Sequence, residues 1–95
     1  MYTVKTTQRF DGWFATLKDR IAKARIQVRI DRMESGNFGD CEPVGNGISE
    51  MRVHVGAGYR VYFKKTDAEI IILLIGGDKS TQAADIKTAL KMAQE

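Results

Sequence analysis

The spacing of apolar residues predicts two helices near the start of the chain. Apolar residues within 8–19 recur at intervals of three and four, which indicates an amphipathic helix. They are Phe10, Trp13, Phe14 and Leu17. Asp19 is a suitable N-cap for a second helix that runs to about Ser35, where the turn-forming sequence SGNFGD begins. A short strand over residues 2–6 is expected before both helices.

Beyond residue 41 the pattern changes to that of strands. Segments 48–55 and 59–64 alternate between apolar and polar residues, as half-buried strands do. Segment 69–76, EIIILLIG, is apolar at almost every position, which predicts an inner strand covered on both faces. The turn-rich segment 41–47 contains Pro43, and proline belongs at the edge of a sheet.

The chain is expected to end in a helix over residues 79–95, capped by Ser80 or Thr81. Its inward residues should be Ala84, Ile86, Ala89, Leu90 and Ala93. The order of elements predicts a single α+β domain over residues 1–95, with two N-terminal helices packed on a small antiparallel sheet and a C-terminal helix.

The sequence GAG at 56–58 predicts a three-residue hairpin loop between the two alternating strands. Val55 would then face Tyr59, and the polar residues of both strands would share one face of the sheet. The expected cross-strand pairs are His54 with Arg60, Arg52 with Tyr62, and Glu50 with Lys64. This face is either a solvated surface with ion pairs or a site that combines cations with acid–base groups.

A second glycine pair, Gly76-Gly77, follows the apolar strand. It is expected to end that strand and turn the chain, which places Asp78 and Lys79 at the strand's end before the last helix.

The second helix carries two apolar stripes on different sides. Ile21, Ala24 and Val28 form one stripe; the other consists of Ala22, Ile26, Ile30 and Met33. The arginines at 25, 29 and 32 lie between the stripes. Either the helix is packed on both sides with its arginines extended to solvent, or these arginines form a basic ridge for phosphates or an acidic partner.

Charge and cysteine usage restrict the function only loosely. The net charge is +3, and the basic excess lies in the first third of the chain, which suits an anionic partner. A single cysteine, Cys41, excludes an internal disulfide and makes a metal site improbable, so no metal or cofactor is expected. The sequence has neither a long apolar run nor a secretory signal at its start, which predicts a cytoplasmic protein with no membrane span.

The segments ISEMRVHVGAGYRVYF and LLIGGDKSTQAADI are the most specific in the chain. With matching positions from Phe10 to Ala89, they resemble the HigB-like addiction-module killer proteins of the RelE/ParE toxin superfamily. The resemblance implies a compact sheet with two N-terminal helices, and cleavage of mRNA on the ribosome as in most RelE-like toxins. It also implies a cognate antitoxin, usually a helix-turn-helix protein, that holds the toxin in a hetero-oligomeric complex. The ParE branch instead poisons DNA gyrase.

Carried over by position, the resemblance assigns basic site residues to Arg52, Arg60 and Lys79. An acid or base near the C-terminus of some relatives has its nearest counterpart in Asp85. Tyr62, Glu50 and His54 are the alternatives.

Metal-independent cleavage requires a base for the 2′-hydroxyl, an acid for the 5′ oxygen, and cations for the phosphate. Arg52 and Arg60 suit the phosphate, because a guanidinium can bind two oxygens at once, and Lys79 adds a charge. Glu50 is the first candidate for the base and His54 for the acid, with Tyr62 orienting or stacking on a base.

Further surfaces complete the hypothesis. RNA binding would extend to Arg25, Arg29, Arg32, Lys64 and Lys79. The antitoxin would cover Ile21, Ala24 and Val28 unless the first helix does so. Two other classes of function remain open: a gyrase poison that acts by protein contact, and a non-catalytic RNA- or protein-binding module.

Overall fold

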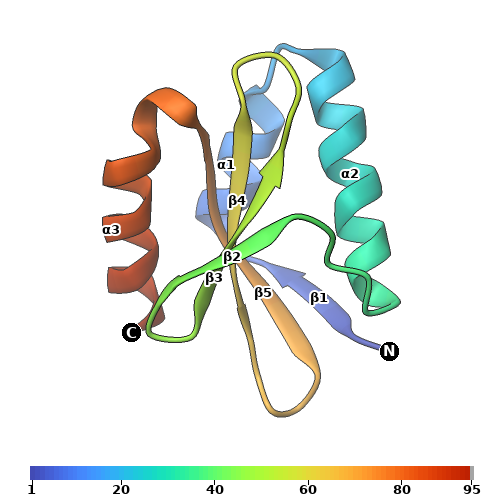
Figure 1. Ribbon diagram of the computed structural model, residues 1–95, viewed down its shortest axis with the longest axis vertical. Helices are drawn as coiled ribbons and strands as arrows, with labels where there is room; N and C mark the ends of the chain where they lie inside the picture. Colours follow the sequence, from blue (N-terminus) through green and yellow to red (C-terminus); the bar gives the residue numbers. More distant parts are fainter. Residues whose placement is uncertain (95) are drawn as a thin grey trace.

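Five strands form one sheet in the order β1-β5-β4-β3-β2, and helices flank it on both sides (Figure 1). The computed structural model describes residues 1–94. The strands are β1 (Thr3–Thr6), β2 (Cys41–Gly45), β3 (Ile48–Val53), β4 (Tyr59–Lys65) and β5 (Ile70–Asp78). The helices are α1 (Gln8–Thr16), α2 (Arg20–Glu34) and α3 (Gln82–Ala93), with a 3-10 turn η1 (Lys79–Thr81) before α3.

The α+β architecture confirms the prediction, but the sheet is mixed rather than purely antiparallel. β1 pairs with β5 in parallel, with Thr3 opposite Ile70 and Thr6 opposite Leu73, while the other three pairings are antiparallel. A parallel pair needs a long connection between its strands. Here the connection consists of both N-terminal helices and three strands. Local periodicity does not reveal a pairing between segments so distant in the sequence.

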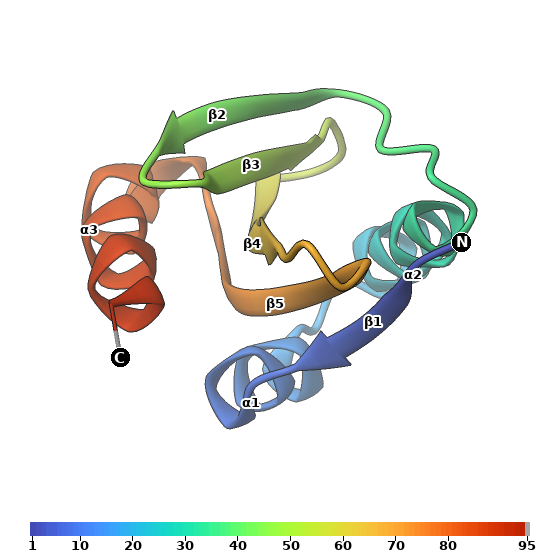
Figure 2. The same ribbon diagram turned by 90° about the horizontal axis from the view of Figure 1, so that it is seen from below.

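β5 lies inside the sheet and is covered on both faces, as its apolar sequence predicted. Figure 2 shows α3 on the opposite side of the sheet from α1 and α2. The larger core joins α1 and α2 to one face; it contains Phe10, Ile26, Ile30, Met33, Met51, Val53, Val61, Phe63, Ile71 and Leu73. The smaller core joins α3 to the other face; its buried members are Ile48, Tyr62, Leu74 and Ala89.

The N-terminal helices follow their sequence signals. α1 ends at Thr16, three residues earlier than predicted. α2 begins after Asp19, whose carboxylate accepts a hydrogen bond from the backbone N–H of Ala22. This is the N-cap interaction expected of that residue. None of the helices within residues 1–94 is sufficiently long and apolar to span a bilayer.

The β3–β4 loop is longer than predicted, and the register moves by two residues. Val53, not Val55, lies opposite Tyr59, so residues 54–58 form a five-residue loop. Gly56 and Gly58 both have positive φ angles, which glycine adopts without strain. The predicted pair of His54 with Arg60 is therefore wrong, because His54 lies in the loop.

The corrected pairs of the β3–β4 hairpin are Arg52 with Arg60, Glu50 with Tyr62, and Ile48 with Lys64. A shift of two residues keeps every strand side chain on its predicted face, because side-chain direction repeats every two residues.

The glycine pair in β5 does not turn the chain. Gly76 and Gly77 lie within the strand, and neither has a positive φ angle. A Cβ on Gly76 would overlap the ring of Trp13, and a Cβ on Gly77 would overlap the carboxylate of Asp85. The two glycines therefore permit close approach of α1 on one face and of α3 on the other.

A β-bulge determines which glycine faces which helix. Between the pairs Phe63–Leu73 and Tyr62–Ile75, β5 contains one extra residue, Leu74. Leu74 and Ile75 both pack in the α3 core, so the alternation restarts one residue later. Gly77 consequently faces α3 and lies opposite Arg60.

The C-terminal helix begins later than predicted. Asp78 caps η1 by accepting from the backbone N–H of Ser80, whereas Thr81 at the N-cap of α3 makes no side-chain capping bond. Ile86, Ala89, Leu90 and Ala93 pack inward as expected. Ala84 is exposed, which contradicts the prediction, because it lies about 200° around the helix axis from Gln82 and Ile86, which face the sheet.

Gly76→Ala should lower the free energy of unfolding by about 1–3 kcal/mol, since the added methyl group must displace Trp13 from a packed face. Gly12→Ala is the matched control, because a Cβ there has no neighbour within 4 Å and Gly12 lies inside α1. That control should be neutral or raise stability by about 0.5–1 kcal/mol. Urea denaturation of both variants measures the difference. Equal stabilities would contradict the close-approach role of Gly76.

Candidate functional site

Three cationic side chains and one histidine surround an open pocket of about 430 Å³ at the β3–β4 loop. Arg52 and Arg60 reach it from adjacent strands, and His54 belongs to the loop itself. Lys79 comes from η1 at the end of β5. The structure therefore brings together four of the seven predicted catalytic residues, from three parts of the chain.

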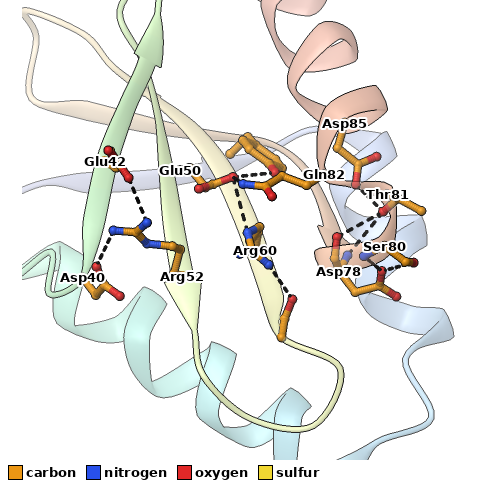
Figure 3. Close-up of polar contacts among 12 residues, drawn as sticks. Asp40, Glu42, Glu50, Arg52, Arg60, Asp78, Ser80, Thr81, Gln82 and Asp85 are labelled. Atoms are coloured by element: carbon orange, nitrogen blue, oxygen red, sulfur yellow. Dashed lines mark hydrogen bonds and ion pairs between the residues drawn. The ribbon is translucent and has the colours of Figure 1, made fainter.

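Arg60 is the most enclosed of these cations. Its Nη1 donates a hydrogen bond of 3.0 Å to the carbonyl oxygen of Gly58. Its Nε lies 3.5 Å from Oε2 of Glu50, in an ion pair with little exposure on either side (Figure 3). These contacts hold the guanidinium at the pocket wall from the loop on one side and from the sheet on the other.

Glu50 is buried, and the expectation of a solvated polar face is wrong at this position. The residue is 2% exposed. Its Oε2 accepts hydrogen bonds from the Tyr62 hydroxyl at 2.8 Å and from Nε2 of Gln82 at 2.9 Å. Gln82 is the first residue of α3, so the C-terminal helix covers the face that the strand pattern alone left open (Figure 3). Nothing in the spacing of the sequence identified Gln82.

Tyr62 is also fully buried, so its ring has no free face on which an RNA base could stack. Burial raises the pKa of the Tyr62 phenol, and the hydrogen bond to Glu50 raises this pKa further. The phenol therefore keeps its proton at neutral pH and serves as a donor to Glu50.

Arg52 has carboxylate partners that the sequence analysis missed. Its Nη2 lies 3.0 Å from Oδ1 of Asp40, and its Nη1 lies 2.8 Å from Oε2 of Glu42. Asp40 also binds His54, with 2.5 Å between Oδ2 and Nε2. Glu42 lies in the edge strand β2, which pairs with β3, and Asp40 lies directly before β2. Only the acidic character of GDCE, next to the strand of Arg52, could have suggested them.

The α2 arginines do not act as one ridge. Arg29 donates to three backbone carbonyl oxygens: those of Arg52 at 2.7 Å, Phe38 at 3.1 Å and Asp40 at 3.3 Å. Arg29 thus fixes the segment before β2 against β3. Arg25 and Arg32 are exposed.

A second groove, of about 400 Å³, lies beside the first pocket. It is lined by Arg25, Val28, Arg29, Arg32, Val53 and His54. Val53 and His54 line both cavities, so the exposed arginines of α2 are next to the cationic pocket.

The remaining predicted residues lie farther from the pocket. Lys64 lies on β4, opposite Ile48 of β3. It is four residues from Arg60, which corresponds to about 13 Å along a strand. The Asp85 carboxylate packs over Gly77 and accepts a hydrogen bond of 2.6 Å from the Thr81 hydroxyl. Across residues 1–94, no group of three or more histidine, cysteine, aspartate or glutamate side chains is placed to hold a metal ion.

The predicted partner surface on α2 is open. Ile21 is 65% and Val28 is 45% exposed, and Ala24 between them is exposed as well. α1 packs against β5 and leaves this stripe uncovered.

The carboxyl of Asp40 should titrate below its ordinary pKa of 3.8, chiefly because of His54 and secondly because of Arg52. A lowered folded-state pKa contributes stability that is present above pH 3.8 and is lost as the pH falls through the folded value. NMR titration of the Asp40 carboxyl should show its midpoint rising in His54→Ala and, by less, in Arg52→Ala. Asp67→Asn, remote from the network, should leave that midpoint unchanged. An unaltered midpoint in His54→Ala would contradict this assignment.

Solved structures that resemble this chain include a free toxin and toxin–antitoxin complexes of the RelE type. A mutant of the E. coli toxin RelE in the free state aligns over 96% of both chains, with a TM-score of 0.75 and 12% identity. The toxin–antitoxin complex RelBE2 from Mycobacterium tuberculosis aligns over 82% of this chain and 98% of that chain, with a TM-score of 0.63 and 20% identity. At these identities the likeness concerns the fold, which is that of RelE.

Sequence comparison gives the family. An uncharacterized protein of Haemophilus influenzae is 53% identical over 92 residues, which cover 97% of this chain and 93% of the relative. Residues 12–95 match the family described as phage derived protein Gp49-like (DUF891). The chain therefore belongs to the Gp49-like (DUF891) family, and its structure has the fold of the RelE toxins.

Proposed function

We propose that this protein is a HigB-like toxin of a type II toxin–antitoxin system that cleaves mRNA on the ribosome and so inhibits translation. The observation that carries the proposal is the gathering of Arg52, Arg60, Lys79 and His54 around one open pocket. Support also comes from the fold, because a free RelE toxin and the toxin of a RelBE2 complex have the same architecture.

The cations suit the charge that develops on a phosphate during attack by the 2′-hydroxyl. Arg60 is held by Gly58 and Glu50 before any substrate binds, so little reorganisation is needed at the moment of reaction. Arg52 makes one contact to each of two exposed carboxylates, and a phosphate can replace both by binding the two Nη atoms in bidentate fashion. Lys79 adds an exposed positive charge at the pocket's edge.

The geometry favours a revised assignment of the proton-transfer groups. Glu50 is buried and has three donors on one oxygen, so it is better suited to holding Arg60 than to removing a proton from a substrate. The His54 side chain is 73% exposed and lines the pocket, and we assign proton transfer to it. Asp85, which extends from α3 over Gly77, the β5 partner of Arg60, is the second candidate.

RNA beyond the scissile phosphate would follow Arg25 and Arg32 along the adjoining groove. Arg29 would support that path through the backbone carbonyls that it binds, and Lys64 would contribute only at a distance. The proposal requires neither a metal nor a cofactor, since the substrate's own hydroxyl is the nucleophile.

The proposed antitoxin, a helix-turn-helix protein in HigB-like systems, would cover the exposed stripe on α2. The same stripe favours the second candidate function, inhibition of DNA gyrase by protein contact, because Ile21 and Val28 expose apolar surface that a partner protein could cover. Such a toxin would need no proton-transfer group in the cationic pocket.

Arg60→Ala should abolish growth arrest in a regulated expression test, with a loss of cleavage of about 100- to 1000-fold, because one preorganised donor to the phosphate is removed. New mRNA 5′ ends within translated frames, mapped by sequencing, provide the measurement. Lys87→Ala, an exposed charge removed from α3, is the control and should behave as the wild type. Growth arrest by the wild type with intact mRNA and damaged DNA would instead indicate that the toxin acts on DNA gyrase.

Ile21→Asp combined with Ala24→Asp should prevent neutralisation by a co-expressed antitoxin while leaving toxicity intact, because two charges enter the apolar stripe at positions that do not line the groove proposed for RNA. Lys18→Asp, which changes charge outside the stripe, is the control. Colony counts with and without the antitoxin measure both effects. Full neutralisation of the double variant would place the antitoxin on another surface.

A further inference from the structure

The buried carboxylate of Glu50 has more partners than an ion pair with Arg60 requires. The Tyr62 hydroxyl, the Gln82 amide and the Arg60 guanidinium all approach the same oxygen, Oε2. The two hydrogen bonds are 2.8 and 2.9 Å long, whereas the distance to Arg60 Nε is 3.5 Å. Tyr62 and Gln82 therefore determine how the carboxylate is oriented, and Arg60 responds to that orientation.

Arg60 depends strongly on this carboxylate. Its Nε is buried and makes no hydrogen bond within residues 1–94, so the charge of Glu50 is what compensates that side of the guanidinium. The remaining fixed contact is the bond from Nη1 to Gly58 in the loop. A carboxylate free to rotate would leave the guanidinium tethered on the loop side alone.

The start of the C-terminal helix places Gln82 beside Glu50. Asp78 and Thr81 form a reciprocal capping box around η1, which fixes the chain immediately before Gln82. The side chain then crosses from α3 to β3, a separation of 32 residues in sequence. Gln82 is thus the direct polar link from α3 to the wall of the pocket.

We propose that Gln82 is a positioning residue that acts through Glu50 to set the direction of the Arg60 guanidinium. Tyr62 supplies the second donor from within the sheet, and its raised pKa keeps that donor protonated. The effect of Gln82 on cleavage rests on the proposed function, whereas its effect on Arg60 does not.

The first test measures Arg60 itself in the purified full-length chain. The hydrogen-exchange rate of its Nε–H is followed by NMR in the wild type and in Gln82→Leu, which keeps the bulk but loses the donor. The rate should rise about tenfold, equivalent to about 1.4 kcal/mol, within the range for a hydrogen bond to a charged group. Gln27→Leu is the matched control, because Gln27 donates a 3.0 Å hydrogen bond to Asp31 on the exposed surface of α2.

Gln82→Asn is a second variant, whose side chain is polar like that of glutamine but too short to reach Glu50. It should raise the Arg60 exchange rate as Gln82→Leu does, and thermal unfolding verifies that both variants remain folded. Equal exchange rates in the wild type and in both folded Gln82 variants would overturn the proposal.

The second test uses mRNA cleavage in a translation extract. If the wild type cleaves, kcat should fall about tenfold in Gln82→Leu with KM nearly unchanged, since a misdirected guanidinium loses contacts of the transition state. An unchanged kcat would overturn the positioning role. If the wild type cleaves nothing, the proposed function fails, and the exchange measurement still decides whether Gln82 positions Arg60.

Discussion

β5 must be covered on both faces, and most of the architecture depends on that requirement. Its apolar side chains point alternately toward α1 and α2 on one side and toward α3 on the other. The bulge at Leu74 and the two glycines that follow allow both layers to approach the end of the strand. Because Gly77 lies opposite Arg60, this same approach brings the start of α3 to the candidate site.

The site itself is governed by two arginines in adjacent positions. Arg52 and Arg60 lie directly opposite each other on β3 and β4, where like charges repel. The protein compensates them differently: exposed Asp40 and Glu42 bind Arg52, whereas buried Glu50 binds Arg60. Arg52 can exchange its two exposed carboxylates for a phosphate, whereas Arg60 stays fixed by the buried carboxylate of Glu50. One cation is therefore adaptable and the other is preorganised.

The adjoining surfaces connect this site to possible partners. The groove along α2 shares His54 and Val53 with the cationic pocket, so a ligand that follows Arg25 and Arg32 reaches the site without crossing a gap. The exposed stripe of Ile21 and Val28 includes a residue of that groove, Val28. A protein bound to the stripe would thus lie beside the path proposed for RNA.

The sequence alone determined the elements, the α+β class and the face of the sheet on which Arg52, Arg60 and Glu50 lie, because these follow from periodicity between near neighbours. It could not give the parallel pairing of β1, the five-residue loop or the bulge, which depend on segments distant in the chain. Burial of Glu50 and Tyr62 was likewise decided by the packing of α3 over the sheet. Contacts between residues distant in the sequence also bind Arg29 to backbone carbonyls and connect Gln82 to Glu50. Only the folded chain brings those partners within hydrogen-bond distance.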